Sequence, residues 1–458
     1  MIDYPGYDHL IRTVYEHNQE HVFEYWDELS DADRGELLDD LSDIDFDLLR
    51  KLLSFKESIQ DTNFDPAPCI PLPGTEREKS AYLAAGETGA AYVRKGKVAA
   101  FVVAGGQGSR LGYEGPKGML RIGPASNRSL FQIHAEKILK YSRKYNTAVP
   151  FLIMTSRSNH YETARYFSEN DFFGLSPEDV FIFPQNMIPS LDAEGKLVLE
   201  TRKSVFKNPD GHGGSLHALH TSGVLAQLKN RGIETISYFQ VDNPLVKIID
   251  PAFIGFHVMA GADISSKAVK KAYLGEKVGV FVRFGGGSIG VVEYSDLPEG
   301  KLHDRDENGN LRFSSGNIAV HLFGREFVGR VASGAGIALP FHRARKKINA
   351  LRGGTTAEIE GLKFEKFVFD ALPLADKNIV LEVVREDEFA PVKNASGVDS
   401  IESAQKLMMD QHRKWLAGRG IRIPKKTRII EISPLAAVEP DDINTDLVVP
   451  DEERVYIS

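Results

Sequence analysis

Apolar residues recur at every third or fourth position in the first part of the chain, which is the spacing of an amphipathic helix. One such face holds Leu37, Leu41, Ile44, Leu48 and Leu52. A typical helix start precedes it at residues 30–33. The other face carries Asp39, Asp40, Asp43 and Asp47. Faces of like charge are usually solvated, so we predict helices with an acidic, solvent-exposed side. Docking of that side to a partner is the alternative.

From residue 97 onward, apolar runs of strand length alternate with helical patterns. The predicted strands cover residues 98–104, 149–154, 180–183 and 235–241, and the predicted helices cover residues 131–145, 161–170 and 216–229. This alternation predicts an α/β fold, with a mainly parallel sheet and helices on both faces. Ligands of such sheets bind beyond the carboxyl ends of the strands.

The remaining segments have other patterns. Residues 278–325 carry shorter alternating runs with glycine turns, which indicate antiparallel strands. Residues 65–74 are too rich in proline for a helix or a central strand. A helical pattern over residues 401–418 is followed by short strands. We therefore expect a helical N-terminal domain with a linker (1–96), a central domain (97–388) and a small C-terminal domain (389–458).

The composition narrows the classes of function. The chain has 458 residues, of which 42% are hydrophobic and 26% charged, and its formal net charge is −8. This indicates a globular protein of two or three domains, and it argues against a nucleic-acid or acidic-membrane partner. With the single cysteine Cys69, no internal disulfide and no thiolate metal cluster can form. We expect a cytoplasmic protein, because we find no secretory signal and no apolar run of about 18 residues.

A glycine-rich turn follows the first strand of the central domain. It reads Gly105-Gly-Gln-Gly-Ser-Arg-Leu-Gly112, and Gly115-Pro-Lys-Gly-Met119 comes next. Glycines let the backbone amides approach a ligand closely, and Arg110 and Lys117 suit a polyphosphate. The spacing fits neither a Walker A loop nor the dinucleotide fingerprint. We predict a nucleotide whose phosphates lie over the end of this strand. The alternative for Lys117 is a surface lysine after a turn.

This loop resembles the nucleotide loop of the eukaryotic-type UDP-N-acetylhexosamine pyrophosphorylases, which are UTP:sugar-1-phosphate uridylyltransferases. Further blocks match in the same order: Ile153-Met-Thr-Ser156, Pro184-Gln-Asn-Met187, Pro209-Asp-Gly-His-Gly-Gly214, Val241-Asp-Asn243, Leu245-Val-Lys247, Ser315-Gly-Asn-Ile318, residues 364–370, 385–389 and 391–395, and Glu431-Ile-Ser-Pro-Leu435. The resemblance covers most of the chain from about residue 80. It implies a Rossmann-like nucleotide-diphospho-sugar transferase fold, with residues 97–388 as the catalytic domain.

The resemblance also implies the residues that hold the triphosphate. Gly105, Gly106 and Gly108 would contact base and phosphates through their backbone. Arg110, Lys117 and Lys393 would neutralise the phosphates and the departing pyrophosphate. Asp242 ends a predicted strand and would hold Mg²⁺, although an Asx turn is the alternative. No general base is expected, because a phosphate monoester is already an anionic nucleophile near neutral pH.

Other matching residues would read the base and the sugar. Gln185 offers an amide that can pair with uracil, and Gly211 would let the backbone approach the base or ribose. Further substrate contacts are expected at Asn243, Lys267, Glu293, Gly316 and Asn317. For Glu293, a paired carboxylate on a sheet face is the alternative.

His212 departs from the hexosamine enzymes, which usually have asparagine there, and resembles UDP-glucose and broad UDP-sugar pyrophosphorylases. We expect a Mg²⁺-dependent enzyme that joins UTP and N-acetylglucosamine-1-phosphate. The alternative acceptors are glucose- or galactose-1-phosphate. A UDP-sugar-binding regulatory protein without catalysis, or a scaffold acting through its acidic helices, is a more distant possibility. The sequence does not determine the oligomeric state.

Overall fold

The computed structural model of the chain describes residues 1–54, 63–333 and 338–458. The chain divides into two compact units. The first unit consists of Met1–Gln60, Gln185–Gly214 and Leu339–Val368, and the second unit of Asp61–Pro184, Ser215–Ala338 and Phe369–Ser458. Each unit is therefore built from segments that are distant in the sequence. The three domains expected from the sequence stay a prediction about which parts fold on their own.

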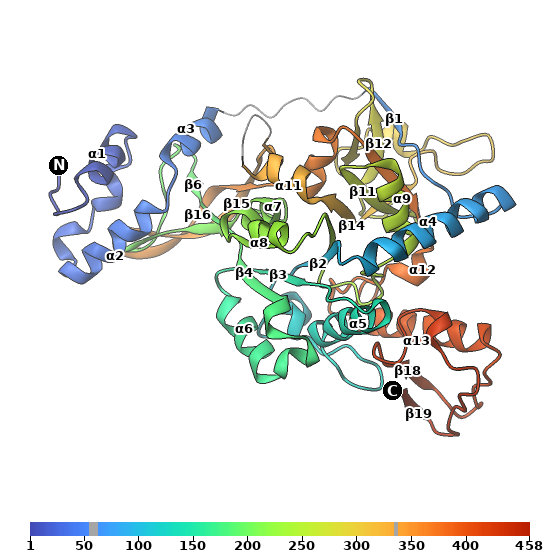
Figure 1. The fold of residues 1–458 in the computed structure, drawn as a ribbon. Coiled ribbons are helices and arrows are strands. Elements are labelled where there is room, and N and C mark those ends of the chain that lie inside the picture. The colour runs from blue at the N-terminus through green and yellow to red at the C-terminus, as the bar shows by residue number, and fades with distance from the viewer. Residues whose placement is uncertain (55–62, 334–337) are drawn as a thin grey trace. The chain divides into compact units, whose positions relative to one another are not determined.

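A large mixed sheet forms the centre of the second unit (Figure 1). Its strands lie in the order β1-β12-β14-β10-β2-β3-β4, with β13 beside β12, β11 beside β14, and β17 beside β11. Their bounds are β1 Phe64–Pro66, β2 Val98–Val103, β3 Phe151–Thr155, β4 Val180–Pro184, β10 Thr235–Gln240, β11 Ile264–Lys270, β12 Val280–Phe284, β13 Ile289–Val292, β14 Ser315–Gly324 and β17 Asn378–Glu382. Strands β10, β2, β3 and β4 are parallel, whereas β14 runs antiparallel to β10, β11 and β12. The predicted α/β fold is confirmed, and so are the antiparallel strands within residues 278–325.

The parallel strands are buried on both faces, which explains their continuous apolar sequences. All residues of β2 and β3 are buried. Helices α5 and α6 lie on one side of these strands, and α7 and α8 on the other (Figure 1). The helices of this part are α4 Glu76–Arg94, α5 Leu130–Tyr145, α6 His160–Glu169, α7 Gly214–Thr221, α8 Val224–Asn230, α9 Pro251–Ala260, α10 Glu299–Leu302, α11 Arg325–Ala332, α12 Arg385–Glu388 and α13 Ile401–Gly418.

Two of the predicted helices show how sequence signals set helix ends. Helix α5 starts where Ser129 Oγ accepts the Gln132 N–H at 3.1 Å, and ends at Asn146 with a left-handed φ of 49°. The single helix predicted over residues 216–229 is wrong. Gly223 adopts a φ of 76° and separates α7 from α8, a backbone conformation that glycine allows at no steric cost.

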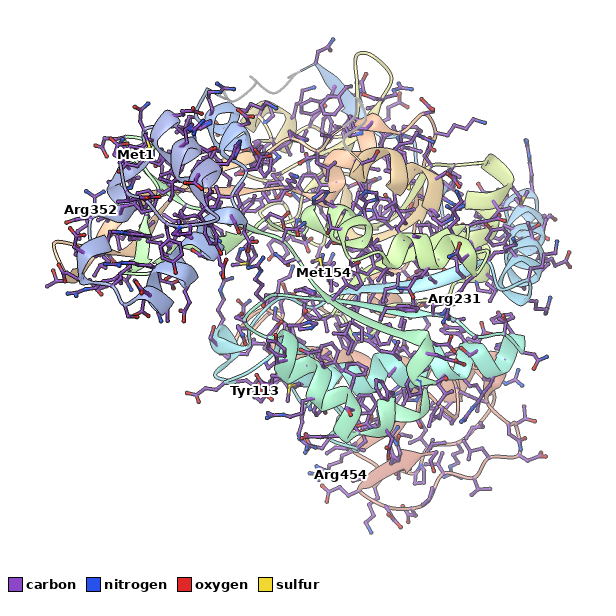
Figure 2. All side chains as sticks on the ribbon, turned by 60° about the vertical axis from the view of Figure 1, so that its left-hand side comes forward. Met1, Tyr113, Met154, Arg231, Arg352 and Arg454 are labelled. Atoms are coloured by element: carbon purple, nitrogen blue, oxygen red, sulfur yellow. The ribbon has the colours of Figure 1, made fainter. Side chains whose placement is uncertain are left out.

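The first unit joins the N-terminal helices to two insertions from the middle of the chain. The helices are α1 Asp8–Glu16, α2 Asp31–Ser42 and α3 Phe46–Ser54, and the strands are β5 Met187–Pro189, β6 Leu191–Asp192, β7 Leu199–Thr201, β8 Ser204–Val205, β9 Lys207–Pro209, β15 His342–Arg352 and β16 Thr355–Glu365. Leu37 and Leu41 of α2 share an apolar core with Leu199, Val205 and Phe364. Figure 2 labels Met1 and Arg352, which both belong to this unit.

The start of α2 at Ser30 is confirmed, since its Oγ accepts the Asp33 N–H at 3.2 Å. The prediction of a solvated acidic face is wrong for Asp40, because this residue forms an ion pair with Lys207 at 2.7 Å. Asp39 accepts a hydrogen bond from the Tyr7 hydroxyl at 2.5 Å. The acidic side of this helix is thus used partly inside the first unit.

The C-terminal segment packs its predicted helix against a small parallel pair. Helix α13 coincides with residues 401–418 and contacts β18 (Ile429–Ile432), which pairs with β19 (Arg454–Ile457). Trp415, Leu416, Ile430 and Val455 lie in the apolar cluster between them. In the described part of the chain, no helix is long and apolar enough to cross a membrane.

Candidate nucleotide site

The glycine-rich loop folds back on itself after β2. Gly108 N–H donates to the Gly115 carbonyl at 2.9 Å, and Lys117 N–H donates to the Gly106 carbonyl at 3.0 Å. Gly112 has a left-handed φ of 71°, which closes a short 3-10 turn over Ser109–Leu111. These bonds bring Lys117 beside Gly106 at the carboxyl end of β2. Gly105, Gly106 and Gly108 line the same turn, and Arg110 is exposed on it.

Lys117 and Asp242 meet at this edge of the sheet. Their Nζ and Oδ2 atoms are 3.3 Å apart, and the two side chains are 19% and 15% exposed. Strands β2 and β10 are parallel neighbours, so the segments that follow them emerge at the same edge. The ammonium neutralises the carboxylate while leaving both accessible to solvent.

The turn that bears Asp242 is held rigidly by its neighbours. The Asn243 amide donates to the Glu388 carbonyl at 2.7 Å and accepts the Ala390 N–H at 3.0 Å and the Leu245 N–H at 3.3 Å. The Val392 N–H donates to the Asp242 carbonyl at 3.0 Å. The Asx-type contact expected as an alternative for Asp242 is therefore made by Asn243. A substrate contact by the buried Asn243 side chain stays a prediction.

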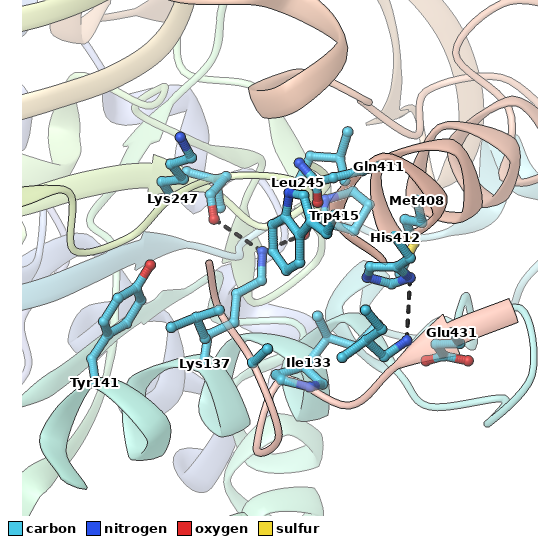
Figure 3. Close-up of a pocket in the computed structure, with 16 residues that line it drawn as sticks. Ile133, Lys137, Tyr141, Leu245, Lys247, Met408, Gln411, His412, Trp415 and Glu431 are labelled. Carbon is cyan, nitrogen blue, oxygen red and sulfur yellow. Dashed lines mark hydrogen bonds between the residues drawn. The ribbon is translucent and has the colours of Figure 1, made fainter. Parts of the chain in front are cut away.

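Helix α5 holds the same turn from the other side. His134 Nε2 donates to the Val241 carbonyl at 2.9 Å, and burial lowers the pKa of this ring to about 3. The Lys137 ammonium donates to the carbonyls of Pro244 at 2.5 Å and Val246 at 3.0 Å (Figure 3). Burial also lowers the pKa of Lys137, to about 7. Both basic side chains come from one helix and act on the backbone around Asp242.

Lys267 is fully buried in an ionic network beside this turn. Its Nζ lies 2.7 Å from Asp250 Oδ2 and 2.6 Å from Glu388 Oε2. Burial alone disfavours the ammonium, but the two carboxylates outweigh it and raise the pKa of Lys267. The ammonium of Lys267 is bonded to Asp250 and Glu388 in this structure. It must leave one of these carboxylates before it can make the predicted contact with a sugar phosphate.

Asp399 lies beside two of the predicted site residues, and the sequence analysis did not single it out. It adopts a left-handed φ of 58°, and its carbonyl accepts the N–H groups of Lys393 at 2.7 Å and Asn394 at 2.9 Å. Burial raises the pKa of its carboxyl, and the charge of Asp242 acts in the same direction. Asp399 thus shapes the exposed loop of Lys393 near Asp242. An aspartate in a Gly-Val-Asp-Ser sequence gives no signal of this.

The predicted sugar contacts follow strands of the same sheet. Asn317 lies on β14 opposite Ala268 of β11, and its Oδ1 accepts the Ala319 N–H at 2.9 Å. Gly316 faces Val280, and a Cβ there would lie 3.2 Å from the Val269 carbonyl oxygen. Glu293 directly follows β13. Their roles toward a sugar stay predictions.

Gln185, Gly211 and His212 belong to the first unit. Gln185 is buried, and Gly211 has a φ of 83°; a Cβ at Gly211 would come within 2.5 Å of the Lys366 carbonyl oxygen. His212 Nδ1 accepts the Val368 N–H at 3.1 Å. The rings of His212 and His342 both stack on Phe367, with centroid distances of 5.4 and 4.4 Å. His212 is therefore held with its Nδ1 turned toward the backbone.

A parallel-stranded core with a glycine-rich loop and a lysine–aspartate pair at neighbouring strand ends is typical of the class of α/β nucleotide-binding proteins. The chain belongs to the UTP–glucose-1-phosphate uridylyltransferase family, whose model matches residues 55–442.

Comparisons with single proteins agree with this assignment. The chain is 36% identical to UDP-N-acetylglucosamine diphosphorylase 2 of Arabidopsis thaliana, over 95% of this chain and 90% of the relative. It is 36% identical to UDP-N-acetylhexosamine pyrophosphorylase-like protein 1 of Homo sapiens, over 88% of this chain and 84% of the relative. The crystal structure of the UDP-N-acetylglucosamine pyrophosphorylase from Trypanosoma brucei superposes with a TM-score of 0.83 at 29% identity, covering 96% and 95% of the two chains.

Proposed function

We propose that the protein transfers the uridylyl group of UTP to N-acetylglucosamine-1-phosphate and releases pyrophosphate. The observation that carries this proposal is the Lys117–Asp242 pair, 3.3 Å apart at the ends of β2 and β10. A cation and a carboxylate at one strand edge suit a metal-bound triphosphate. The names of the relatives above support the sugar.

The reaction is an in-line displacement at the α-phosphorus. The phosphate of the sugar attacks, the bond to the pyrophosphate breaks, and the pyrophosphate leaves with the bonding electrons. The protein contributes position and charge neutralisation. Backbone amides of Gly105 and Gly106 hold the nucleotide. The predicted backbone contact of Gly108 would require its N–H to leave the Gly115 carbonyl, which it bonds at 2.9 Å. Lys117 neutralises the phosphates, together with Arg110 and Lys393.

Asp242 is the residue that would hold Mg²⁺. Among the described residues no group of three His, Cys, Asp or Glu side chains could bind a metal by itself. One accessible carboxylate fits Mg²⁺, which is commonly bound by one or two carboxylates together with substrate phosphates. The ion would stabilise negative charge on the phosphate oxygens.

Base and sugar recognition is assigned to two groups of residues, each described within its own unit. In the first unit, Gln185 pairs with uracil, and Gly211 and His212 approach the ribose or sugar. In the second unit, the predicted sugar contacts are Lys267, Glu293, Gly316 and Asn317. The amide of Asn243 holds the Asp242 turn and completes the set. We place the reaction in the cytoplasm, with UTP and the sugar phosphate as partners and neither nucleic acid nor membrane.

A hexose-1-phosphate is the second candidate acceptor, and His212 is the observation that favours it. At this position, which we expect near the sugar, the imidazole of His212 replaces the asparagine amide that the hexosamine enzymes usually have. Its Nδ1 is already used by the Val368 N–H, so it cannot also accept from an N-acetyl group.

The test is pyrophosphate release from UTP and Mg²⁺ with four acceptors, namely the 1-phosphates of N-acetylglucosamine, N-acetylgalactosamine, glucose and galactose. We expect the fastest release with N-acetylglucosamine-1-phosphate. Faster release with a plain hexose would move the assignment to the second candidate. Binding of UDP-sugar without release from any acceptor would contradict catalysis.

A further inference from the structure

Asp40 of α2 contacts the strand that leads to Gly211 and His212. Its Oδ1 lies 2.7 Å from Lys207 Nζ, and its backbone carbonyl accepts from the same nitrogen at 2.6 Å. Its Oδ2 accepts the Val205 N–H at 2.8 Å. The Lys207 side chain is only 9% exposed. Helix α2 is thus bonded to the last residue of β8 and the first residue of β9.

Strand β9 connects this anchor to the proposed recognition residues. It spans Lys207–Pro209, and Asp210, Gly211 and His212 come next in the chain. β9 pairs with β5 in antiparallel register, from Lys207 opposite Pro189 to Pro209 opposite Met187. The Asp210 N–H then donates to the Asn186 carbonyl at 3.3 Å, directly after Gln185. One short ladder therefore carries both recognition loops of the first unit.

Other contacts of the N-terminal helices are made to segments that do not lead to Gly211 and His212. Lys203 pairs with Asp33 at 2.7 Å and Glu36 at 2.8 Å, at the turn between β7 and β8. The Gln19 side chain bonds the backbone of Gly195 and Leu197. These contacts dock the helices onto the inserted strands, whereas Asp40 holds the strand that enters the Gly211–His212 loop.

We propose that Asp40 is a positioning residue for substrate recognition. By holding Lys207 it sets the placement of Gly211 and His212 and, through the β5–β9 ladder, of Gln185. This inference rests on the proposed function of those three residues. It assigns the N-terminal helices a part in substrate binding, where the sequence left partner docking open.

The burial of Lys207 is the reason to expect a measurable effect. An exposed ion pair contributes little to stability, because water and salt screen it. Removing one partner of a buried pair leaves a charge without compensation. Without the Asp40 carboxylate, Lys207 keeps one carbonyl contact and moves toward water, and β9 moves with it.

The chain offers a fluorescent probe for each unit. Its two tryptophans are Trp26 and Trp415, which lie in the first and second unit. In a Trp415→Phe background, Trp26 reports the first unit alone.

We would compare Asp40→Ala and Asp40→Asn with the control Asp47→Ala. Asp47 lies on the next helix, α3, and pairs with Arg50 of the same helix at 2.9 Å.

We expect Asp40→Ala to raise the KM for UTP and for N-acetylglucosamine-1-phosphate about tenfold, with kcat within about twofold of wild type, because the phosphate-holding residues of the second unit are untouched. Asp40→Asn should give a smaller rise, since its amide oxygen still accepts one N–H. The control should leave both constants unchanged. The affinity for UDP-N-acetylglucosamine without Mg²⁺ should fall in parallel with the KM rise.

Unchanged KM values, or a fall in kcat alone, would overturn the inference. If Trp26 emission shows that Asp40→Ala opens the first unit, Asp40→Asn and Lys207→Met decide by the same KM criterion. Failure of the wild-type chain to release pyrophosphate would overturn the proposed function instead, so the two failures are distinguishable.

Discussion

Lys117 Nζ lies 3.3 Å from Asp242 Oδ2, although the two residues are 125 positions apart in the sequence. The parallel pairing of β2 and β10 brings their carboxyl ends together and explains the contact. In this structure the ammonium of Lys117 neutralises the carboxylate of Asp242, a group that suits a metal ion. We predict that a bound metal–nucleotide complex would exchange this pairing, with Lys117 turning to phosphate.

Lys117→Ala should lower turnover far more than it weakens binding of UDP-sugar. The ammonium acts on the charge of the departing pyrophosphate, which UDP-sugar lacks. Loss of one such group costs about 100-fold in kcat. Stopped assays of pyrophosphate release and calorimetry with UDP-N-acetylglucosamine measure the two effects. Lys140→Ala on α5 is the control, and near-normal turnover in Lys117→Ala would remove this lysine from the site.

Asp242→Ala should abolish both most of the activity and the dependence of the remainder on Mg²⁺. The carboxylate of Asp242 directly follows this strand end and is accessible to solvent, and alanine removes it. Mn²⁺ binding in the presence of UTP, followed by electron paramagnetic resonance, gives a readout independent of turnover. Asp65→Asn, an exposed partner of Arg312, should bind Mn²⁺ normally. Unchanged metal binding in Asp242→Ala would contradict the assignment.

Lys137 predicts a pH dependence of stability. Its pKa is about 7 in the folded chain against an ordinary 10.5, so between these values the unfolded chain binds a proton that the folded chain lacks. Stability from this group therefore rises with pH above 7, by at most about 1.4 kcal/mol per pH unit. Lys137→Met removes this slope, since methionine does not titrate.

The measurement is denaturant unfolding of wild type and Lys137→Met at several pH values from 7 to 9. The unfolding free energy of wild type should rise relative to that of Lys137→Met as pH rises. Lys140→Met, on the same helix, is the matched control and should run parallel to wild type. Parallel curves for Lys137→Met as well would show that Lys137 titrates normally in the folded chain.

Gly118 lies against the ring of Phe131, and a Cβ there would come within 2.2 Å of the ring. Gly118→Ala must displace either α5 or the Lys117 segment. Overpacking of this kind costs about 1–3 kcal/mol, and we expect a loss of both stability and turnover. Phe131→Leu in the same chain should restore part of both. Gly286→Ala, where a Cβ meets open space, should have little effect, and an equal loss there would refute the steric argument.

The sequence predicts those parts of the fold where a local pattern decides. Strands β2 and β3 are buried on both faces and appear as unbroken apolar runs, and α13 carries a clear helical period. The long β15–β16 hairpin was not predicted. Most of β15 is exposed or half-buried, with Ile348 and Ala350 as its buried residues, so no alternation marks it. The second strand of the hairpin also pairs with β6, a distant segment of the first unit.

The candidate site likewise contains contacts that the sequence predicts and contacts that it does not. Strand ends predict where Lys117 and Asp242 come together, because the topology of a parallel sheet fixes them. The contact between Asp40 and Lys207 has no such rule, since nothing local tells which segment will cover an acidic helix face. Asp399 was missed for a different reason. Its contribution comes from a left-handed backbone and two amide contacts, which a side-chain pattern does not encode.

His212 predicts how the acceptor preference can be changed. Because its Nδ1 accepts the Val368 N–H at 3.1 Å, the neutral ring carries its proton on Nε2 and can only donate there. Asparagine offers both a donor and an acceptor in a smaller volume. We expect His212→Asn to raise the preference for N-acetylglucosamine-1-phosphate over glucose-1-phosphate by about tenfold, the size typical of a single polar contact. The ratio of kcat/KM values for the two acceptors measures it. His220→Asn, an exposed change on α7, is the control, and an unchanged ratio in His212→Asn would place acceptor discrimination elsewhere in the chain.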